Sequence, residues 1–309
     1  MWCSLVVTAG KPLAKESQMP LMSRSDGVYL SKLPGFRKMF PFLMPTRTEA
    51  YMHHDQLLRM KKTLQVLDEL NTGRTERRYT IFHVVLAAAV RSFAMRPDAH
   101  RFVAGRRIYQ RRHIELSFVT KKELTDTAAE TNVKLRFEPT DTLPQVAERV
   151  WAAVSDTKTS KSSKDEDITD TLTRLPRFLT RLIMWGWKVL DYFNLLPASE
   201  IKGDALYCSA YFANLGSIGL KAVQHHLFEW GTCPFFVVIG KLKKEVLVSD
   251  DGQIVVEDVV TSTFTLDERI TDGVSYARVI GMVSNFIEDP TRLLEPPDPA
   301  ALPDPFALV

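Results

Sequence analysis

Two adjacent histidines, His225 and His226, are the residues of this sequence best suited to proton transfer near neutral pH. An acid and an indole, Glu229 and Trp230, follow within four residues. An unperturbed imidazole has a pKa of ~6.5, so it can accept a proton under physiological conditions. This grouping predicts a general base. The alternative is that one histidine packs under Trp230 while the other is solvated.

A second candidate base is Glu268, in the charged turn D-E-R-I-T-D-G of residues 267–273. A free carboxylic acid, with a pKa of ~4.3, matches a thiol of pKa ~8.5 less well than an imidazole does, at a cost of roughly 3 kcal/mol. Burial would recover this difference, because desolvation raises the pKa of a carboxyl group. Arg269 opposes such a rise if its guanidinium faces the carboxylate. A salt-bridged surface residue is therefore an equal alternative.

No pattern typical of a metal, disulfide or nucleotide site occurs. The three cysteines, Cys3, Cys208 and Cys233, are scattered and form no C-x-x-C pair, which favours a reduced, cytoplasmic setting. The pair His53-His54 has no acid or cysteine at ligand spacing, so we expect it on the surface and expect no metal. Neither G-x-G-x-x-G nor a P-loop is present, so nucleotide binding by those motifs has no support.

The composition is that of an ordinary globular protein. Of 309 residues, 40 are basic and 37 acidic, giving a net charge of +3, and 45% are hydrophobic. Because no stretch concentrates the basic residues, nucleic-acid binding is not expected. The longest apolar run, residues 178–196, is interrupted by Arg181, Lys188 and Asp191, and the N-terminal run 5–7 is too short for a signal peptide. We expect neither export nor a transmembrane segment.

The elements that would position these side chains begin with an extended N-terminal arm, residues 1–45, whose prolines are too closely spaced for a long helix. Apolar residues at three- and four-residue spacing predict a helix from Asp55 to about residue 73. Thr80 is a plausible N-cap for a second, nearly all-apolar helix that stops before Pro97. We expect a hairpin next at 101–110, then strands at 114–118 and 134–138 and a helix at 143–154.

The C-terminal half is predicted to begin with a mobile loop at 157–170, which is rich in Ser, Thr, Lys and Asp and has almost nothing to bury. An extra apolar helix at 174–196 could cover the sheet, lie in a subunit interface or touch a membrane surface. Its apolar residues run nearly all round the helix, so burial in protein is the preferred interpretation. Strands are expected next at 205–212, 235–241 and 254–266, the last one bent or broken. A final helix at 274–287 and a disordered or extended Pro-rich tail at 296–309 follow.

Five segments, in this order along the chain, resemble the chloramphenicol acetyltransferase-like family, which includes the catalytic E2 subunits of 2-oxoacid dehydrogenase complexes. The helix, proline turn and hairpin of residues 81–119 come first. N-L-G-S-I-G at 214–219 is similar to the family's S-N-L-G-x-x-G element, and F-V-V-I-G at 236–240 to the strand that follows it. The turn at 267–273 resembles D-H-R-x-x-D-G, and E-D-P-T-R-L-L at 288–294 resembles the segment after the final helix.

This resemblance covers roughly residues 45–295. It implies an α+β fold: one chloramphenicol acetyltransferase-like two-layer domain at 46–295, with a mixed sheet flanked by helices. It also implies a homotrimer with active sites between neighbouring subunits, a coenzyme A thioester as substrate and no tightly bound cofactor. The run H-H-L-F-E-W-G-T at 225–232 and the D-E-R turn resemble a standalone bacterial subgroup with Glu in place of the motif His. With so short an arm before the domain, we expect no lipoyl domain.

The resemblance implies site residues and reveals two departures. The motif His, which takes the proton from the attacking group, is replaced by Glu268, and the oxyanion-stabilising Ser is replaced by Ala213 unless Ser209 or Ser217 substitutes for it. The neighbouring Asn214 is placed in the substrate channel.

Three further residues take their expected roles from the family. Asp272 is implied to be a structural partner of an arginine, and we predict that this arginine is Arg47. Glu229 and Trp230 are placed near the substrate channel with Asn214.

Two hypotheses follow. The first is an acyltransferase that moves an acyl group between coenzyme A, or a carrier thiol, and an unknown acceptor, with Glu268 or His226 as base. The second is a catalytically inactive trimeric scaffold or acyl-CoA-binding protein that kept the fold. They differ in whether Glu268 and a histidine face one buried channel.

Overall fold

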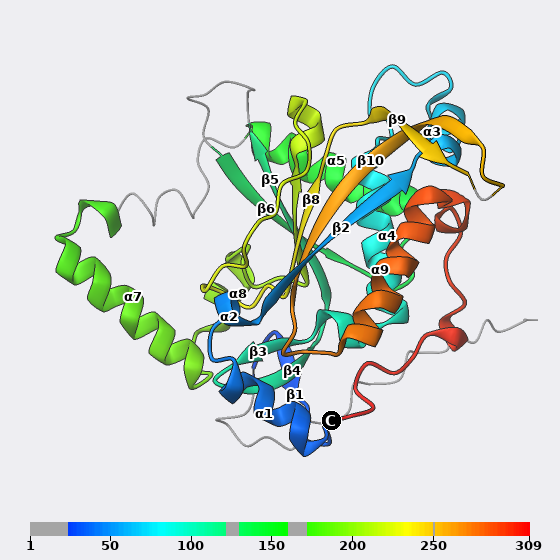
Figure 1. Cartoon of the computed structure of the whole chain (residues 1–309). Coiled ribbons are helices and arrows are strands. Elements are labelled where there is room, and N and C mark those ends of the chain that lie inside the picture. Colours follow the sequence, from blue (N-terminus) through cyan, green and yellow to red (C-terminus); the bar gives the residue numbers. More distant parts are fainter. Residues whose placement is uncertain (1–23, 122–129, 160–171, 250) are drawn as a thin grey trace, which may run out of the picture.

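A mixed seven-stranded sheet is the centre of the fold (Figure 1). This computed structural model describes residues 24–121, 130–159, 172–249 and 251–309. In order across the sheet, the strands are β2 (Tyr51–Arg59), β10 (Ile254–Asp267), β8 (Phe235–Ile239), β7 (Ala210–Asn214), β5 (Ile114–Lys121) and β6 (Glu130–Phe137), with β9 (Lys243–Val248) paired to β10. β5, β7 and β8 are parallel, and the other pairs are antiparallel. The predicted α+β class with a mixed sheet is confirmed.

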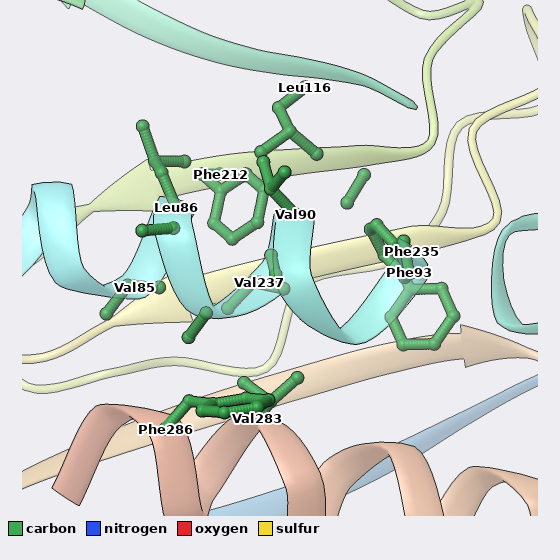
Figure 2. Packing of buried hydrophobic residues seen from close by; sticks show 14 of the residues in the cluster. Val85, Leu86, Val90, Phe93, Leu116, Phe212, Phe235, Val237, Val283 and Phe286 are labelled. Carbon is green, nitrogen blue, oxygen red and sulfur yellow. The ribbon is translucent and has the colours of Figure 1, made fainter. Parts of the chain in front are cut away.

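Helices pack against one face of the sheet and form the main core with it (Figure 2). They are α3 (Lys61–Asn71), α4 (Ile81–Met95), α5 (Leu143–Thr159) and α9 (Gly273–Glu288). Apolar side chains of α4 and α9 meet those of the strands, among them Val85, Leu86, Val90, Phe93, Leu116, Phe212, Phe235, Val237, Val283 and Phe286. Because strand residues alternate between faces, the opposite face carries a different set of side chains, and these matter for the candidate site.

The local signals at the ends of α4 are confirmed. Thr80 and His83 form a capping box, in which each side chain accepts a hydrogen bond from the other residue's backbone N–H. The helix ends at Met95, with Arg96 as its C-cap, because the following Pro97 cannot continue it. Every residue from His83 to Ala94 is buried, as the all-apolar pattern predicted.

The N-terminal arm predicted as extended contains a strand and a helix in its described part. β1 (Gly27–Tyr29) joins the confirmed hairpin β3 (Phe102–Ala104) and β4 (Arg107–Arg111) in a second sheet of order β1-β4-β3. α1 (Gly35–Leu43) follows, with Pro34 at its N-cap, where no helical hydrogen bond is lost. Residues 1–23 lie outside the described residues.

The helix predicted from Asp55 begins only at Lys61, because residues 51–59 form β2 along the edge of β10. The apolar spacing was misleading because pairing with β10, 200 residues away, outweighs the local helical pattern. β10 itself is unbroken, since it pairs with β2 and β8 along one part and with the unpredicted β9 along the other.

Other boundaries in the C-terminal half also shift. The strand expected at 205–212 starts at Ala210, and the final helix is confirmed as α9. In the predicted mobile loop, 157–159 belong to α5, and 160–170 lie outside the described residues. The tail is not simply extended: η5 (Pro299–Ala301) forms in it, and the Leu308 carbonyl accepts a hydrogen bond from the Lys32 N–H.

Short elements complete the connections between the layers. They are α2 (Arg47–Ala50), η2 (Pro97–His100), α8 (Ala198–Gly203), η3 (Leu215–Ile218) and η4 (Pro290–Leu293). Among the described residues, no helix combines the length and the apolar content needed to cross a membrane.

The extra apolar helix, α7 (Arg177–Tyr192), was predicted to be buried, and this prediction is wrong for a single chain. None of its residues is buried, and the helix projects from the body of the domain (Figure 1). Its apolar residues cover much of the helix surface, but the sheet is already covered by α4, α5 and α9 on one face. No described element packs along the outer side of α7.

A buried ionic network fixes the end of α7 against the small sheet. Arg24 contacts Asp26 and Asp191, each at 2.9 Å, and Arg111 lies 3.7 Å from Asp26. Burial opposes ionisation of Asp26, but Arg24 and then Arg111 outweigh it, so the pKa of Asp26 is lowered. The network therefore holds one carboxylate between two cations in the interior.

We predict that Asp26→Asn lowers the free energy of unfolding by about 3 kcal/mol, because it leaves two buried guanidinium groups with too little negative charge. Since the folded-state pKa of Asp26 is lowered, its contribution is present above the unfolded pKa of ~3.9 and is lost as the pH falls through the folded value. Denaturant unfolding at pH 7 and at pH 3 measures both effects.

Glu148→Gln is the matched control, because Glu148 pairs with Arg77 at 2.8 Å with both side chains 59% exposed. It should cost less than about 1 kcal/mol. Equal losses for the two variants would contradict a stabilising role for the buried network.

Candidate active site

The turn of residues 267–273 is built on a buried ion pair between neighbours. Both carboxylate oxygens of Asp267 accept hydrogen bonds from Arg269, at 2.8 Å from Nε and 2.7 Å from Nη2. Burial lowers the pKa of Arg269, but its hydrogen bonds and attraction to Asp267 outweigh this, so the pKa is raised. The Asp267 carbonyl accepts a hydrogen bond from the Tyr276 hydroxyl of α9. The pair thus joins the end of β10 to the start of α9.

Glu268, between these two residues, points away from the interior. Its side chain is exposed, and its backbone N–H donates to the Ala50 carbonyl at 2.9 Å. Arg37 of α1 donates to the Glu268 and Thr271 carbonyls, at 3.4 and 3.1 Å, so α1 lies across the turn. Within one chain, Glu268 lacks the burial that would make a carboxylate an effective base.

The predicted ion pair between Arg47 and Asp272 is absent from the described structure. Asp272 caps α9 by accepting a hydrogen bond from the Ser275 N–H at 2.8 Å. Arg47 is fully buried and donates to the backbone carbonyls of Phe228, at 2.9 Å, and Gly231. Burial lowers its pKa, and the carboxylate that opposes this most is Asp267. The arginine therefore supports a loop, while Asp272 does the work of a helix cap.

Glu229 and Trp230, which the sequence placed near the substrate channel, are fixed by this loop. A Glu229 carboxylate oxygen accepts from the N–H and the hydroxyl of Thr48, each at 2.8 Å. Burial opposes this, yet the hydrogen bonds to Thr48 dominate and lower the pKa of Glu229. The Trp230 indole donates to Asp204 at 2.5 Å, so the indole does not cover the histidine pair as the alternative supposed.

His225 and His226 have their imidazole rings held by the backbone. The Nδ1 atom of His225 lies 2.7 Å from the His226 carbonyl, and that of His226 lies 3.1 Å from the Leu227 carbonyl. A carbonyl cannot donate a hydrogen, so each Nδ1 must carry one, and each neutral ring keeps an Nε2 lone pair. The rings stack 4.8 Å apart, and His225 also stacks on Phe236 at 3.8 Å. The pair is thus oriented for accepting protons at Nε2.

His53 joins this group, although the sequence indicated only a surface residue. Thr265 of β10 donates its hydroxyl hydrogen to the His225 carbonyl and therefore accepts from Nδ1 of His53, at 2.9 Å. His53 lies on β2 directly opposite Thr265. Only the register of β2 against β10 reveals this neighbour, because no motif contains both residues. Burial lowers the pKa of His225, so it is neutral near pH 7.

The strand-end element at Asn214 is formed but provides no serine in the family position. Asn214 caps η3 by accepting from the Ser217 N–H at 3.3 Å, and the Ser217 hydroxyl donates back to the Asn214 carbonyl. Ser209 is buried, and its hydroxyl accepts from the Glu115 N–H at 3.1 Å. Both serines are thus used in local structure. Neither replaces the group missing at Ala213.

The sheet register keeps Ala213 and Glu268 apart within one chain. Ala213 pairs with Val238, and Val238 with Thr263, five residues before Glu268. At ~3.4 Å per residue this is roughly 17 Å along the strands. Within the described chain, the two motif positions are therefore not adjacent.

Two hollows border the turn of residues 267–273, and both are lined in part by α1. The larger, about 600 Å³, is bordered by Arg37, Asp272 and the C-terminal tail. The smaller, about 310 Å³, is bordered by Arg47, Glu229 and Trp230. Neither of these two linings includes Glu268, His225 or His226, so neither hollow brings Glu268 and a histidine together.

Comparison with known proteins agrees with the motifs. Residues 198–295 match the family model "2-oxoacid dehydrogenases acyltransferase (catalytic domain)". The predicted family resemblance is confirmed. The matched stretch is about a third of the chain. It contains Asn214, the histidine pair and the turn of residues 267–273. A search of curated protein sequences gave no match.

Solved structures show that the fold extends well beyond that stretch. Dihydrolipoamide acetyltransferase from Azotobacter vinelandii aligns with a TM-score of 0.56 at 13% identity, covering 93% of this chain and 100% of that one. A probable dihydrolipoamide acetyltransferase from Listeria monocytogenes gives 0.55 at 13%, covering 83% and 92%. A 2-oxoacid dehydrogenase complex catalytic core from Thermoplasma acidophilum gives 0.53 at 11%, covering 84% and 97%. The chain therefore has the chloramphenicol acetyltransferase-like fold of E2 catalytic cores.

We predict that Arg47→Ala costs about 3 kcal/mol of unfolding free energy, because two backbone carbonyls lose a charged donor. Asp272→Ala should cost only about 1 kcal/mol, as expected for a lost N-cap. In the double variant the two losses should add within ~0.5 kcal/mol, since the residues share no contact. Chemical denaturation of the four proteins tests this. An interaction energy near 3 kcal/mol between the two substitutions would instead support the ion pair between Arg47 and Asp272 that the sequence suggested.

Proposed function

We propose that this protein is an E2-type acyltransferase in which the histidine pair, with His225 foremost, replaces the missing motif histidine as base. The observation that carries this proposal is the orientation of both rings, whose Nδ1–H groups are held by backbone carbonyls while Nε2 stays free. His225 is half-buried, with a lowered pKa, whereas Glu268 is exposed. Among the candidates, the imidazoles are thus the better prepared proton acceptors.

The reaction we propose is transfer of an acyl group from coenzyme A, or another carrier thiol, to an acceptor hydroxyl or thiol. Nε2 of the base takes the acceptor's proton as its oxygen or sulfur attacks the thioester carbonyl. The tetrahedral intermediate then collapses, the carbon–sulfur bond breaks, and the protonated imidazole returns the proton to the leaving thiolate. The acyl group ends on the acceptor, and no external oxidant, reductant or bound cofactor is required.

The oxyanion of that intermediate needs a donor that Ala213 cannot provide. The side chain of Asn214 is the candidate, because its oxygen is committed to the Ser217 N–H and its amide nitrogen is therefore directed away from η3. A carboxamide NH₂ is a suitable donor to a developing oxyanion. We propose this role for Asn214 in place of the family serine.

Assembly into a homotrimer is part of the proposal. The separation of roughly 17 Å between the two motif positions along the strands supports a site completed by a neighbouring chain. In a trimer, Asn214 of one subunit would face the turn of residues 267–273 or the histidine pair of the next.

The second candidate is an inactive trimeric scaffold or acyl-CoA-binding protein. The exposure of Glu268 and the structural use of Ser209 and Ser217 support it. The oriented histidines support the enzyme instead, and the family match is to a catalytic domain. We therefore prefer the acyltransferase.

We predict that His225→Asn lowers the rate of acyl transfer by roughly 10²-fold, because asparagine keeps a donor for the His226 carbonyl but cannot accept the proton. An acyl-CoA panel with thiol-release readout measures it. His54→Asn is the matched control: His54 is an exposed histidine whose ring contacts Gln56, and its replacement should leave the rate unchanged. Glu268→Gln should also have little effect. If Glu268→Gln abolishes transfer and His225→Asn does not, the assignment of the base is wrong.

The pH dependence follows from the lowered pKa of His225. Only the neutral imidazole accepts a proton, so activity should rise with pH through an apparent pKa below ~6.5 and then level off. The residual activity of His225→Asn should not show this rise with pH. A rise of the wild-type activity centred above pH 7 would indicate another base.

We predict a mass in solution of about three times the 35.1 kDa of one chain. Light scattering at micromolar concentration measures it. A monomer would contradict both the trimer and the intersubunit site.

A further inference from the structure

The outer side of α7 presents large apolar side chains to solvent. Phe178 is 70% exposed, Leu182 58% and Trp185 62%. At 100° per residue these three fall within one narrow arc of the helix, and Tyr192 and Phe193, both exposed, fall on its two sides. We call this surface, defined by these five residues, the outer face of α7. A soluble chain rarely exposes such a stripe without a binding role.

The charges beside the outer face have a single sign. Arg177, Arg181 and Lys188 are exposed and lie along one flank of it. The sequence from 172 to 196 contains one acid, Asp191, and it is turned inward to Arg24. Within residues 172–196, the helix therefore combines aromatic and aliphatic side chains with a row of cations along one flank.

The C-terminal end of α7 is fixed to the domain, so the outer face has a defined position relative to the sheet. Besides the ion pair of Asp191 with Arg24, the Asn194 amide donates to the Tyr109 hydroxyl at 2.8 Å. Gly105 lies so close to the Tyr192 carbonyl that an added Cβ would stand 2.2 Å from it. The Trp187 side chain packs inward, beside Trp230 at 5.9 Å. These contacts lie at the inner side and leave the outer face uncovered.

We propose that α7 docks the protein onto an anionic lipid surface, lying in the interface with its outer face among the acyl chains. Phe178, Leu182 and Trp185 would enter the boundary between headgroups and acyl chains, while the cations on the flank contact anionic headgroups. Tryptophan is suited to this depth because its ring is apolar and its N–H is polar.

Charge complementarity favours lipid over a second copy of this helix. A symmetric contact between two outer faces would bring the cations of both chains together, and like charges repel at an interface. An anionic membrane offers both an apolar phase and neutralising charge to the same surface. The alternative of a protein partner, including a different surface of a neighbouring subunit in the proposed trimer, is an outcome of the test.

Sedimentation of the full chain with lipid vesicles tests the proposal. Vesicles of equal parts phosphatidylcholine and phosphatidylglycerol should bind it at least roughly tenfold more tightly than phosphatidylcholine alone, and added salt should weaken binding because it screens the cations. The double variant Phe178→Ser/Trp185→Ser should lose binding to both kinds of vesicle. Arg177→Gln/Arg181→Gln should lose the preference for phosphatidylglycerol.

Val246→Ser/Ile254→Ser is the matched control. These residues are 66% and 77% exposed but lie on the β9–β10 ribbon, away from α7. The control should bind vesicles like the wild type. Because no residue of α7 is buried, the α7 variants should unfold at the wild-type temperature, which a thermal scan verifies.

Three results would overturn the proposal. One is the absence of vesicle binding by the wild type. Another is a lack of specificity: equal binding of the wild type to neutral and anionic vesicles, or a loss of vesicle binding in the Val246→Ser/Ile254→Ser control equal to that in the α7 variants. The third is that the α7 variants change the mass of the protein in solution without changing vesicle binding, which would show that the outer face is covered by protein. Acyl transfer in solution is measured separately, so its failure would leave this result interpretable.

Discussion

The ion pair between Asp267 and Arg269 connects the parts of the structure on which the candidate site depends. Asp267 ends β10, its carbonyl accepts from Tyr276 of α9, and Arg269 reaches the carbonyls of Met44 and Pro45 before β2. One buried interaction therefore sets the end of the central strand, the entry to a core helix and the connection after α1. A buried pair of this kind gives little net stability by itself, but its hydrogen bonds define a single arrangement of the chain.

The same region explains why the residue at position 268 is not needed to hold the fold. Glu268 takes no part in the buried pair on either side of it, and its side chain points outward. The turn is held by Asp267, Arg269 and the cap at Asp272, so the intervening position is free to change. The loop supported by Arg47 meanwhile continues from the histidine pair, and the fold can supply imidazoles from a different segment.

The Arg24–Asp26–Arg111 network and α7 form a second structural unit beside the sheet. Buried charges hold the small sheet and the last turn of α7 together, while the rest of the helix extends into solvent. In this unit, a buried ionic network beside the hydrophobic cluster of Phe102, Ala104 and Tyr109 supports a helix with an apolar outer face. Such an exposed apolar face is expected where the surface binds a partner.

The sequence by itself determined the features that depend on local contacts and on motif order. The N-cap at Thr80, the stop before Pro97 and the run of buried residues in α4 all arise within a few residues of the chain. The five motif segments in their order were enough to indicate the fold. Tertiary structure decided what depends on distant pairing. The strand at 51–59 exists because β10 is beside it, and His53 reaches Thr265 only through that register. Arg47 has loop carbonyls as partners instead of Asp272, and α7 is exposed although its composition suits a core. These outcomes follow from which surfaces the whole chain leaves available, and no local pattern contains that information.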